Sequence, residues 1–175
     1  MTNELHQPDE NTGTMEVLER HQFDVSRLKD YMHENVQGFD GDITLEEFKG
    51  GQSNPTYKVI TPSQSYVLRR KPPGKLLKSA HAVDREYKVI TALNKTDVPV
   101  PKSYALCEDE DVIGTAFYLM EFKDGRVLWD PAMEHSPKEE AKGVYESMNE
   151  TMAKLHSVNP NDIGLEDFGK PGNYV

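Results

Sequence analysis

Three short strand-like segments, joined by very short links, constrain the fold of this chain more than any other feature. They cover residues 43–48, 56–60 and 64–70. The first link contains Gly-Gly and Asn-Pro, and the second reads Thr-Pro-Ser, all residues typical of turns. Links this short cannot hold the crossover that a parallel pair needs, so the segments predict an antiparallel meander.

Helical periodicity precedes and follows this meander. The expected helices cover residues 23–36, about 79–94 and 137–156. Two more strand-like segments, 104–107 and 116–122, are joined by an acidic turn at 108–111. The order helix, three strands, helix, two strands, helix predicts an α+β fold. It resembles a protein-kinase small lobe, a five-stranded antiparallel sheet plus a helix, followed by the start of a helical large lobe.

Polarity divides the chain into three expected parts. Residues 1–20 are polar and lack an apolar period, which predicts a disordered N-terminal arm. Residues 21–123 form the expected small lobe. Residues 124–175 form a linker and the first helix of an incomplete large lobe, whose tail is rich in Gly and Pro.

Charge and cysteine content exclude several classes of function. The chain has 30 acidic and 20 basic residues and a net charge of −10, which disfavours nucleic acid and anionic membranes as partners. The lone Cys107 cannot form an intramolecular disulfide, and no long apolar run is present. These features predict a cytoplasmic protein. One cysteine and histidines without ligand spacing also argue against a metal or thiol hydrolase.

The Gly-rich link between the first two strands is the first candidate for ligand binding. A loop that covers a polyphosphate needs glycine, because backbone N–H groups must approach the phosphates closely. The link reads Gly50, Gly51, Gln52, Ser53, Asn54. The plain alternative is an ordinary hairpin turn, and the link does not match G-x-G-x-x-G.

The third strand and the following helix carry a candidate ion pair. Strand alternation puts Val67 and Arg69 on one face and Leu68 and Arg70 on the other. Arg69 beneath a phosphate loop is suited to pair with phosphates, and Glu86 on the helix is suited to hold it. Taken singly, each charge is better explained as a solvated surface group.

In combination, these motifs resemble the aminoglycoside phosphotransferase (choline-kinase-like) family, in particular a subgroup fused to acyl-CoA dehydrogenases. The shared motifs are Gly-Gly-Gln-Ser-Asn-Pro-Thr-Tyr, Tyr-Val-Leu-Arg-x-Lys-Pro-Pro-Gly, Ser-Ala-His-Ala-Val-Asp-Arg-Glu-Tyr and Cys-Glu-Asp-x-x-Val-Ile-Gly-Thr-Ala-Phe-Tyr. They occur in this order from about residue 48 to residue 129, and a weaker likeness continues to residue 173. The resemblance covers the N-terminal half of such an enzyme.

The resemblance implies a role for individual residues. Gly50 to Asn54 correspond to the phosphate loop, Arg69 to the kinase strand lysine and Glu86 to its helix partner. Val67 corresponds to a residue that packs on adenine. The hinge, whose backbone bonds adenine, corresponds to Met120, Glu121 and Phe122. For Met120 and Phe122, the ordinary core of a buried strand is an equal alternative. Arg in place of Lys replaces a point charge with a planar fork.

The residues that complete phosphoryl transfer are absent from this sequence. The family supplies them as His-Gly-Asp with a following Asn, and then a later Asp that binds Mg²⁺. None of the six histidines is followed two residues on by Asp. Asp167-Phe168-Gly169 spells a kinase magnesium motif, but no catalytic loop precedes it, so we interpret it as a chance match. We therefore expect a fragment or truncated chain that is inactive by itself.

Two functions are consistent with these observations. The first is the nucleotide-binding part of an ATP- and Mg²⁺-dependent phosphotransferase, with the Mg²⁺ ligands in the missing lobe. The family likeness favours a small hydroxyl compound as acceptor, with hydroxyacyl thioesters preferred over antibiotics. The alternative is a non-catalytic nucleotide-binding or interaction module, a truncated pseudokinase. The apolar stripe of 137–156 further predicts a covering partner, either a second chain or self-association.

Overall fold

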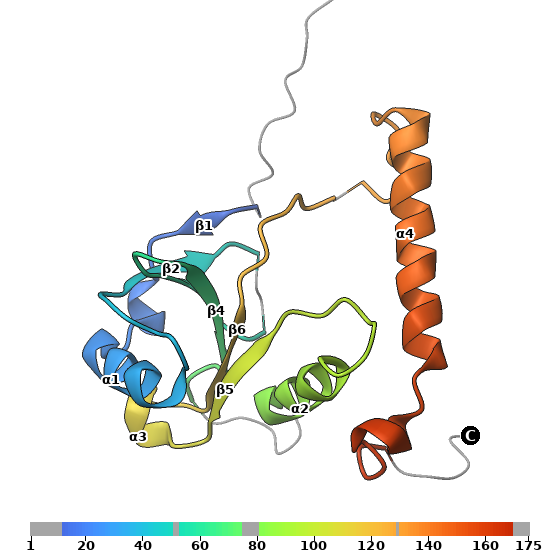
Figure 1. Ribbon diagram of the computed structural model, residues 1–175. Helices are drawn as coiled ribbons and strands as arrows, with labels where there is room; N and C mark the ends of the chain where they lie inside the picture. The colour runs from blue at the N-terminus through green and yellow to red at the C-terminus, as the bar shows by residue number, and fades with distance from the viewer. Residues whose placement is uncertain (1–11, 51–52, 75–80, 129, 170–175) are drawn as a thin grey trace, which may run out of the picture. The chain divides into compact units, whose positions relative to one another are not determined.

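The computed structural model describes residues 12–50, 53–74, 81–128 and 130–169 (Figure 1). Its elements, in chain order, are β1 (Thr14–Met15), the 3₁₀ turn η1 (Glu19–His21), α1 (Val25–Asn35), β2 (Thr44–Phe48), β3 (Thr56–Ile60), β4 (Ser65–Arg70), α2 (Val83–Leu93), β5 (Ser103–Cys107), α3 (Glu110–Ile113), β6 (Phe117–Glu121), α4 (Lys138–Ser157) and the 3₁₀ turn η2 (Pro160–Ile163).

The strands form one antiparallel sheet in the order β1-β2-β3-β4-β6-β5. The α+β fold and the predicted meander are confirmed, but the sheet has six strands where the sequence predicted five. The additional strand, β1, pairs with β2 through Thr14 opposite Phe48. The expectation of disorder is therefore wrong for residues 12–20, because backbone pairing can order a segment that has no apolar period. Residues 1–11 lie outside the described residues.

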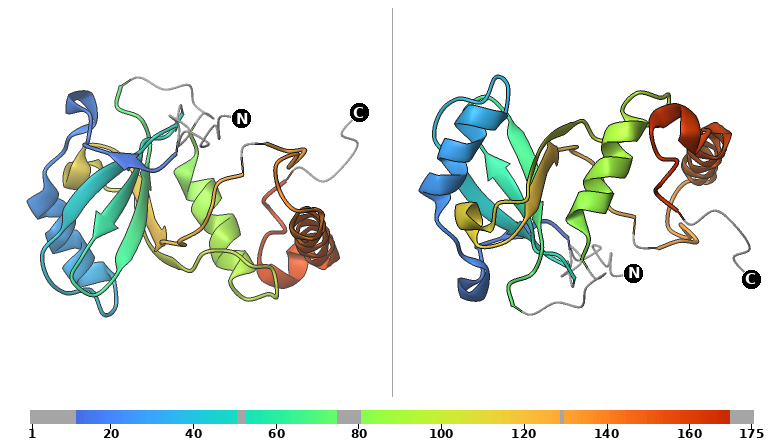
Figure 2. Two further views of the ribbon diagram at one scale, coloured as in Figure 1. Left: turned by 90° about the horizontal axis from the view of Figure 1, so that it is seen from above. Right: turned by 90° about the horizontal axis from the view of Figure 1, so that it is seen from below.

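Helix α1 covers one face of the sheet, and the first turn of α2 lies over the other (Figure 2). Asp24 caps the N-terminus of α1, since its side chain accepts from the backbone N–H groups of Ser26 and Arg27. Leu28 and Met32 are fully buried on the sheet-facing side of α1. Burying one such side chain contributes about 1.5–3 kcal/mol, so these contacts fix α1 on the sheet.

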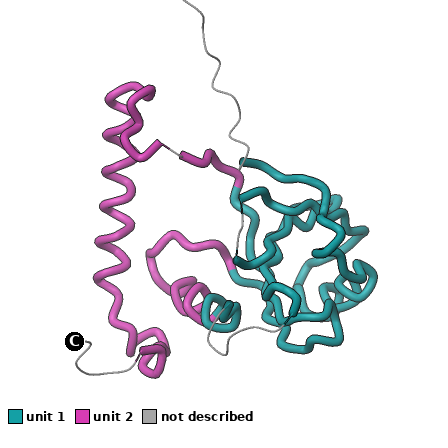
Figure 3. Tube along the Cα trace, turned by 180° about the vertical axis from the view of Figure 1, so that it is seen from behind, with its two compact units in different colours: residues 1–87, 103–123 teal, residues 88–102, 124–175 magenta. Residues whose placement is uncertain are grey.

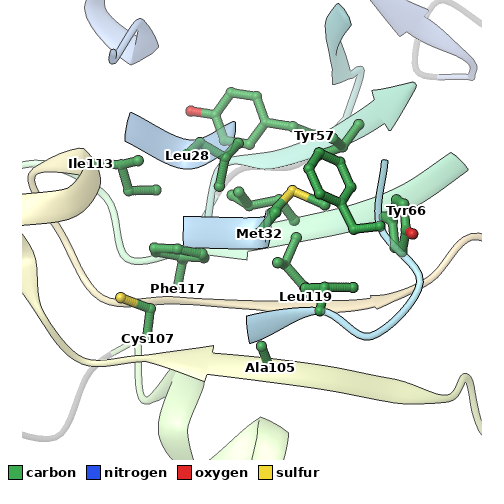
Figure 4. Packing of buried hydrophobic residues seen from close by; sticks show 13 residues of the cluster. Leu28, Met32, Tyr57, Tyr66, Ala105, Cys107, Ile113, Phe117 and Leu119 are labelled. Atoms are coloured by element: carbon green, nitrogen blue, oxygen red, sulfur yellow. The ribbon is translucent and has the colours of Figure 1, made fainter. Parts of the chain in front are cut away.

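The main core lies between α1 and the sheet. Figure 4 shows Leu28 and Met32 of α1 beside Phe117 and Leu119 of β6 and Tyr57 of β3, in a cluster that also includes Cys107. Tyr57, Phe117 and Leu119 are fully buried. Alternation along each strand sends these residues to the α1 face, and their neighbours to the face over which α2 begins.

The acidic segment before β6 differs from its prediction. In place of a simple turn, residues 110–113 form the one-turn helix α3. The side chain of Asp109 accepts from the N–H of Asp111, and Gly114 ends the turn with φ of 86°. Ile113 is buried in the core below α1. That tertiary contact, which the local sequence does not reveal, favours a helical turn here.

The chain comprises two compact units, residues 1–87 with 103–123 and residues 88–102 with 124–175 (Figure 3). The predicted division into an arm, a small lobe and a linker with one helix stays a prediction. In the second unit, α4 begins directly after Pro137 and ends at Ser157. Four large apolar side chains of this helix are exposed: Tyr145, Met148, Met152 and Leu155. A partner that covers them also stays a prediction. Among the described helices, none has the length and apolar character needed to cross a bilayer.

Candidate functional site

Strand β4 places two adjacent arginines on opposite faces of the sheet. Arg69 lies opposite Thr56 of β3 and Tyr118 of β6, on the face where α2 begins. Arg70 points to the other face and is buried. The predicted alternation along β4 is therefore confirmed, and Arg69 is the more exposed of the two arginines.

The predicted ion pair between Arg69 and Glu86 is present. Arg69 Nε donates to Glu86 Oε2 at 2.7 Å, and Arg69 Nη1 donates to Thr56 Oγ1 at 3.1 Å. The two charged side chains are 31% and 36% exposed, so solvent reaches one edge of the pair. These bonds account for two of the five guanidinium N–H groups, which leaves donors for an anionic ligand.

Glu86 lies in the first turn of α2 and accepts bonds from three elements. Besides Arg69, its Oε2 atom accepts from the hydroxyl of Tyr118 at 3.1 Å, and its Oε1 atom accepts from Asn54 Nδ2 at 3.3 Å. Burial and the neighbouring Glu86 carboxylate raise the pKa of Tyr118 above its ordinary value. The phenol therefore stays protonated, as its role as a donor requires.

Asn54 connects the end of the Gly-rich link to the beginning of α2. Its side chain is buried and lies between Glu86 and His81, with 2.6 Å between Asn54 Oδ1 and His81 Nδ1. Asn54 also has a backbone role, since its carbonyl accepts from the hydroxyl of Thr56 at 3.0 Å. The link, β3, β4, β6 and α2 thus meet in one hydrogen-bonded network.

The other residues of the predicted phosphate loop have mixed outcomes. Gly50 has φ of 80°, a left-handed conformation that favours glycine. Gly51 and Gln52 lie outside the described residues. Ser53 is exposed at the surface. Asn54 belongs to the predicted loop, and its side chain bonds to Glu86 and His81. Phosphate binding by this loop stays a prediction.

Of the predicted adenine-contacting residues, Val67 and Met120 lie on the same sheet face as Arg69, whereas Glu121 is paired with Tyr66 on the other face. Val67 is paired with Met120, two positions along the strand from Arg69. Met120 and Phe122 are only half-buried and are not members of the core cluster, in contrast to Leu119. The geometry thus disfavours the interpretation of Met120 and Phe122 as ordinary core.

An aromatic pair lies beside this predicted hinge. The rings of Phe48 and Phe122 stack with centroids 6.4 Å apart, and Lys58 Nζ lies 4.3 Å from the centroid of Phe122. The side chain of Glu121 accepts from Lys123 Nζ at 2.6 Å. The ammonium group thus lies over the face of the Phe122 ring in a cation–π contact, and the two stacked rings add flat apolar surface at the predicted hinge.

Sequence reasoning missed three members of the network: Thr56, His81 and Tyr118. Thr56 and Tyr118 follow from strand register, because they are the cross-strand neighbours of Arg69, but register requires the sheet order. His81 lies inside the Ser-Ala-His-Ala-Val-Asp-Arg-Glu-Tyr motif. This motif was the one sign in the sequence that His81 has a role. Local sequence patterns do not predict that a histidine before a helix contacts a loop residue 27 positions earlier.

A separate groove of about 520 Å³ lies in the second unit and shares no residue with the network. It is lined by residues of both charges, including the Glu150–Lys154 ion pair at 2.7 Å. A pair of this kind on an exposed helix surface is largely solvated. Within the described part of the chain, no cluster of three or more His, Cys, Asp or Glu side chains is arranged to hold a metal ion.

The sheet, the helix that follows its fourth strand and the strand-to-helix ion pair define the small lobe of a kinase-like phosphotransferase. Comparison with known proteins agrees. Residues 44–175 match the model of the phosphotransferase enzyme family, APH. The chain belongs to this family.

The relatives that contain a similar region are much longer proteins. A probable acyl-CoA dehydrogenase, IBR3 of Arabidopsis thaliana, is 47% identical over 90% of this chain and 20% of its own length. Acyl-CoA dehydrogenase family member 11 of Rattus norvegicus is 41% identical over 95% of this chain and 22% of its own length. The chain thus spans about a fifth of these relatives.

A solved structure also matches. The crystal structure of a candidate aminoglycoside phosphotransferase from Ralstonia eutropha has a TM-score of 0.77 and 50% sequence identity to this chain. The match covers 87% of this chain and 44% of that protein. The predicted kinase-like fold and the resemblance to the aminoglycoside phosphotransferase family are confirmed.

Proposed function

We propose that this chain carries the nucleotide-binding lobe of an ATP-dependent phosphotransferase that acts on a hydroxyl group of a small molecule. The ion pair of Arg69 and Glu86 is the observation that carries the proposal. It pairs a strand cation with a helix carboxylate, the arrangement that kinases require for phosphoryl transfer. Family membership supports the same reaction class.

The residues present fit a nucleoside triphosphate. The free N–H groups of Arg69 suit a phosphate oxygen, and the left-handed backbone at Gly50 suits a close phosphate loop. Val67, Met120 and the ring of Phe122 offer an apolar surface to the base. Bound ATP supplies the γ-phosphoryl group. This chain's own residues orient the phosphates and hold Arg69 in a fixed direction.

The remaining parts of the site belong, in this proposal, to regions of the relatives that this chain does not match. The sequence holds no His-x-Asp, so we assign the substrate-orienting Asp and the Mg²⁺ ligands to such a region. The acceptor we propose is a hydroxyacyl thioester. Its support is that relatives sharing this region are named acyl-CoA dehydrogenases, which links it to acyl thioester chemistry.

Titration of the chain with Mg-ATP, read by calorimetry and thermal shift, tests the nucleotide-binding role. We expect saturable binding, and we expect Arg69→Ala to weaken it by about 10- to 100-fold, since a charged hydrogen bond contributes roughly 1.5–3 kcal/mol. The matched control is Arg27→Ala, which removes an exposed arginine of α1 outside the network. It should bind Mg-ATP like the wild type.

Either of two results would count against the proposal. Failure of a well-folded chain to bind Mg-ATP would favour the alternative function, a non-catalytic interaction module. Equal loss of affinity in the Arg69 and Arg27 variants would mean that general surface charge, and not the ion pair with Glu86, attracts the nucleotide.

A further inference from the structure

His81 has a backbone conformation that is unusual for its residue type. Its φ is 60°, in the left-handed region, and it lies two residues before α2 begins. Histidine enters this region more readily than most non-glycine residues, but the conformation still needs support from its surroundings. One support is local, since the carbonyl of His81 accepts from the N–H of Val83 at 2.9 Å. The other is the bond between its ring and Asn54.

The network determines the direction of each bond around Asn54. A carboxylate oxygen of a guanidinium-paired Glu86 only accepts, so the Asn54 atom that faces it must be the donor Nδ2. Oδ1 of the same amide then faces His81 and can only accept. His81 Nδ1 must therefore carry a proton and donate across the 2.6 Å contact.

This donation keeps the Asn54 amide from rotating. A flipped amide would present Oδ1 to the Glu86 carboxylate, and two acceptors would face each other in a buried place. With the amide fixed, Glu86 Oε1 is occupied by Asn54, and Oε2 is left to Arg69 and Tyr118. The direction of the Arg69 guanidinium thus depends on His81 through two intermediate side chains.

We propose that His81 is a positioning residue for the nucleotide phosphates, which acts by locking Asn54 and thereby Glu86 and Arg69. The inference rests on the proposed nucleotide-binding function. His81 touches no phosphate in this account. It joins Asn54, at the end of the Gly-rich link, to the start of α2, so that the position of Asn54 and the orientation of the ion pair depend on each other. A role confined to capping α2 would direct the ring to that helix, and not to a loop residue 27 positions earlier.

The first experiment tests the network without any nucleotide. Nitrogen-15 NMR of the histidine rings should show His81 protonated at Nδ1, and the Asn54 side-chain amide should exchange slowly with water. In His81→Gly, which tolerates the positive φ and removes the ring, amide exchange of Asn54 should become at least about tenfold faster. An Nδ1 without a proton, or unchanged Asn54 exchange, would overturn the inference.

The second experiment separates phosphate positioning from general folding. We expect His81→Gly to weaken Mg-ATP binding by about tenfold while adenosine binding changes less than about twofold, since only the phosphates meet Arg69. His81→Asn, which tolerates the backbone conformation and retains a donor, should restore part of the loss. The matched control is Met133→Gly, at the other described non-glycine residue with positive φ, and it should leave the affinity unchanged.

The outcomes distinguish the inference from the function on which it rests. If the wild-type chain binds Mg-ATP and His81→Gly binds it equally well, the positioning role fails and the proposed function stands. Equal loss of ATP and adenosine affinity would assign His81 a purely structural role. If the folded wild type does not bind Mg-ATP, the proposed function fails and the positioning role fails with it, whatever the NMR shows of Asn54.

Discussion

Arg69 and Arg70 are neighbours on β4, yet the two faces of the sheet give them different environments. Arg69 is half-exposed and bonds to a carboxylate and a hydroxyl. Arg70 is 4% exposed, and its Nε donates to Thr115 Oγ1 at 2.9 Å while its Nη1 has no hydrogen-bond partner. Its guanidinium lies 5.2 Å from the ring centroid of Phe23.

This difference shows how one strand serves two purposes. Burial lowers the pKa of Arg70, which is the sign of a cation with little solvation. A buried guanidinium with an unpaired N–H group contributes little to the stability of the fold. On this face the stability comes from apolar side chains such as Leu68. On the opposite face, water competes for the exposed edge of Arg69, so its hydrogen bonds contribute little to the stability of the fold. Their main effect is to orient the guanidinium group. We therefore assign stability to the α1 face and ligand geometry to the α2 face.

The largest effect that tests this assignment is a pair of truncations on β6. Leu119 is fully buried on the α1 face, and its neighbour Met120 is half-buried on the other. Leu119→Ala should lower the free energy of unfolding by about 2–5 kcal/mol, because it leaves a cavity in the core. Met120→Ala should lower it by less than about 1.5 kcal/mol and should weaken Mg-ATP binding. Urea unfolding measures both, and equal losses of stability would break the comparison.

The next largest effect is a loss of stability at alkaline pH that arises from Tyr57 on the α1 face of the sheet. Burial raises the pKa of Tyr57 from 10.0 to about 12, with Arg70 opposing and Glu47 adding to the rise. Between these two values the unfolded chain has lost the phenolic proton and the folded chain keeps it, so stability falls as pH rises. One such group contributes up to ~1.4 kcal/mol per pH unit.

Urea unfolding between about pH 9 and pH 12 measures this slope. Tyr57→Phe should reduce the slope, although it also removes the bond from the Tyr57 hydroxyl to the carbonyl of His21 and lowers stability at neutral pH. Tyr145→Phe, at an exposed ring of α4, is the control and should leave the slope unchanged. If Tyr57→Phe retained the full slope, titration on the core face would not explain the alkaline loss.

The smallest effect on stability is expected when each arginine is replaced by methionine, an apolar side chain of similar length. Arg70→Met removes a buried N–H group without a partner, and Thr115 still donates to the carbonyl of Lys71. Its stability should lie within about 1 kcal/mol of the wild type or above it. Arg69→Met should change stability equally little, but it should weaken Mg-ATP binding by about 10- to 100-fold, as expected for Arg69→Ala. A strongly destabilised Arg70→Met would show that Arg70 contributes to the core, and the two faces would differ less than we infer.

Much of the fold could be predicted from the sequence because its signals are local. The strand segments and the start of the last helix at Pro137 depend on residues a few positions apart. The ion pair of Arg69 and Glu86 could be proposed because strand alternation, together with family motifs, restricted the candidates. Its distances and its additional partners could not.

The failures have a different cause. The strand β1 exists because β2 offers an unpaired edge to a polar segment, and the helix α3 exists because Ile113 enters a core built from distant elements. The role of Asn54 shows the same limit. Its sequence context predicts a phosphate loop, and only the structure shows that its side chain is buried between His81, which precedes α2, and Glu86 in the first turn of that helix.

The sequence by itself determined the order of strands β2 to β6 and of helices α1, α2 and α4, the face on which each β4 side chain lies and the family to which the chain belongs. These properties follow from periodicity and from short motifs, which are written locally in the chain. Only the tertiary structure decided that Thr56, His81 and Tyr118 join the site, and that Arg70 is buried with a group unpaired. Those outcomes depend on strand register and on the docking of α2, where contacts between distant residues determine which polar groups find partners.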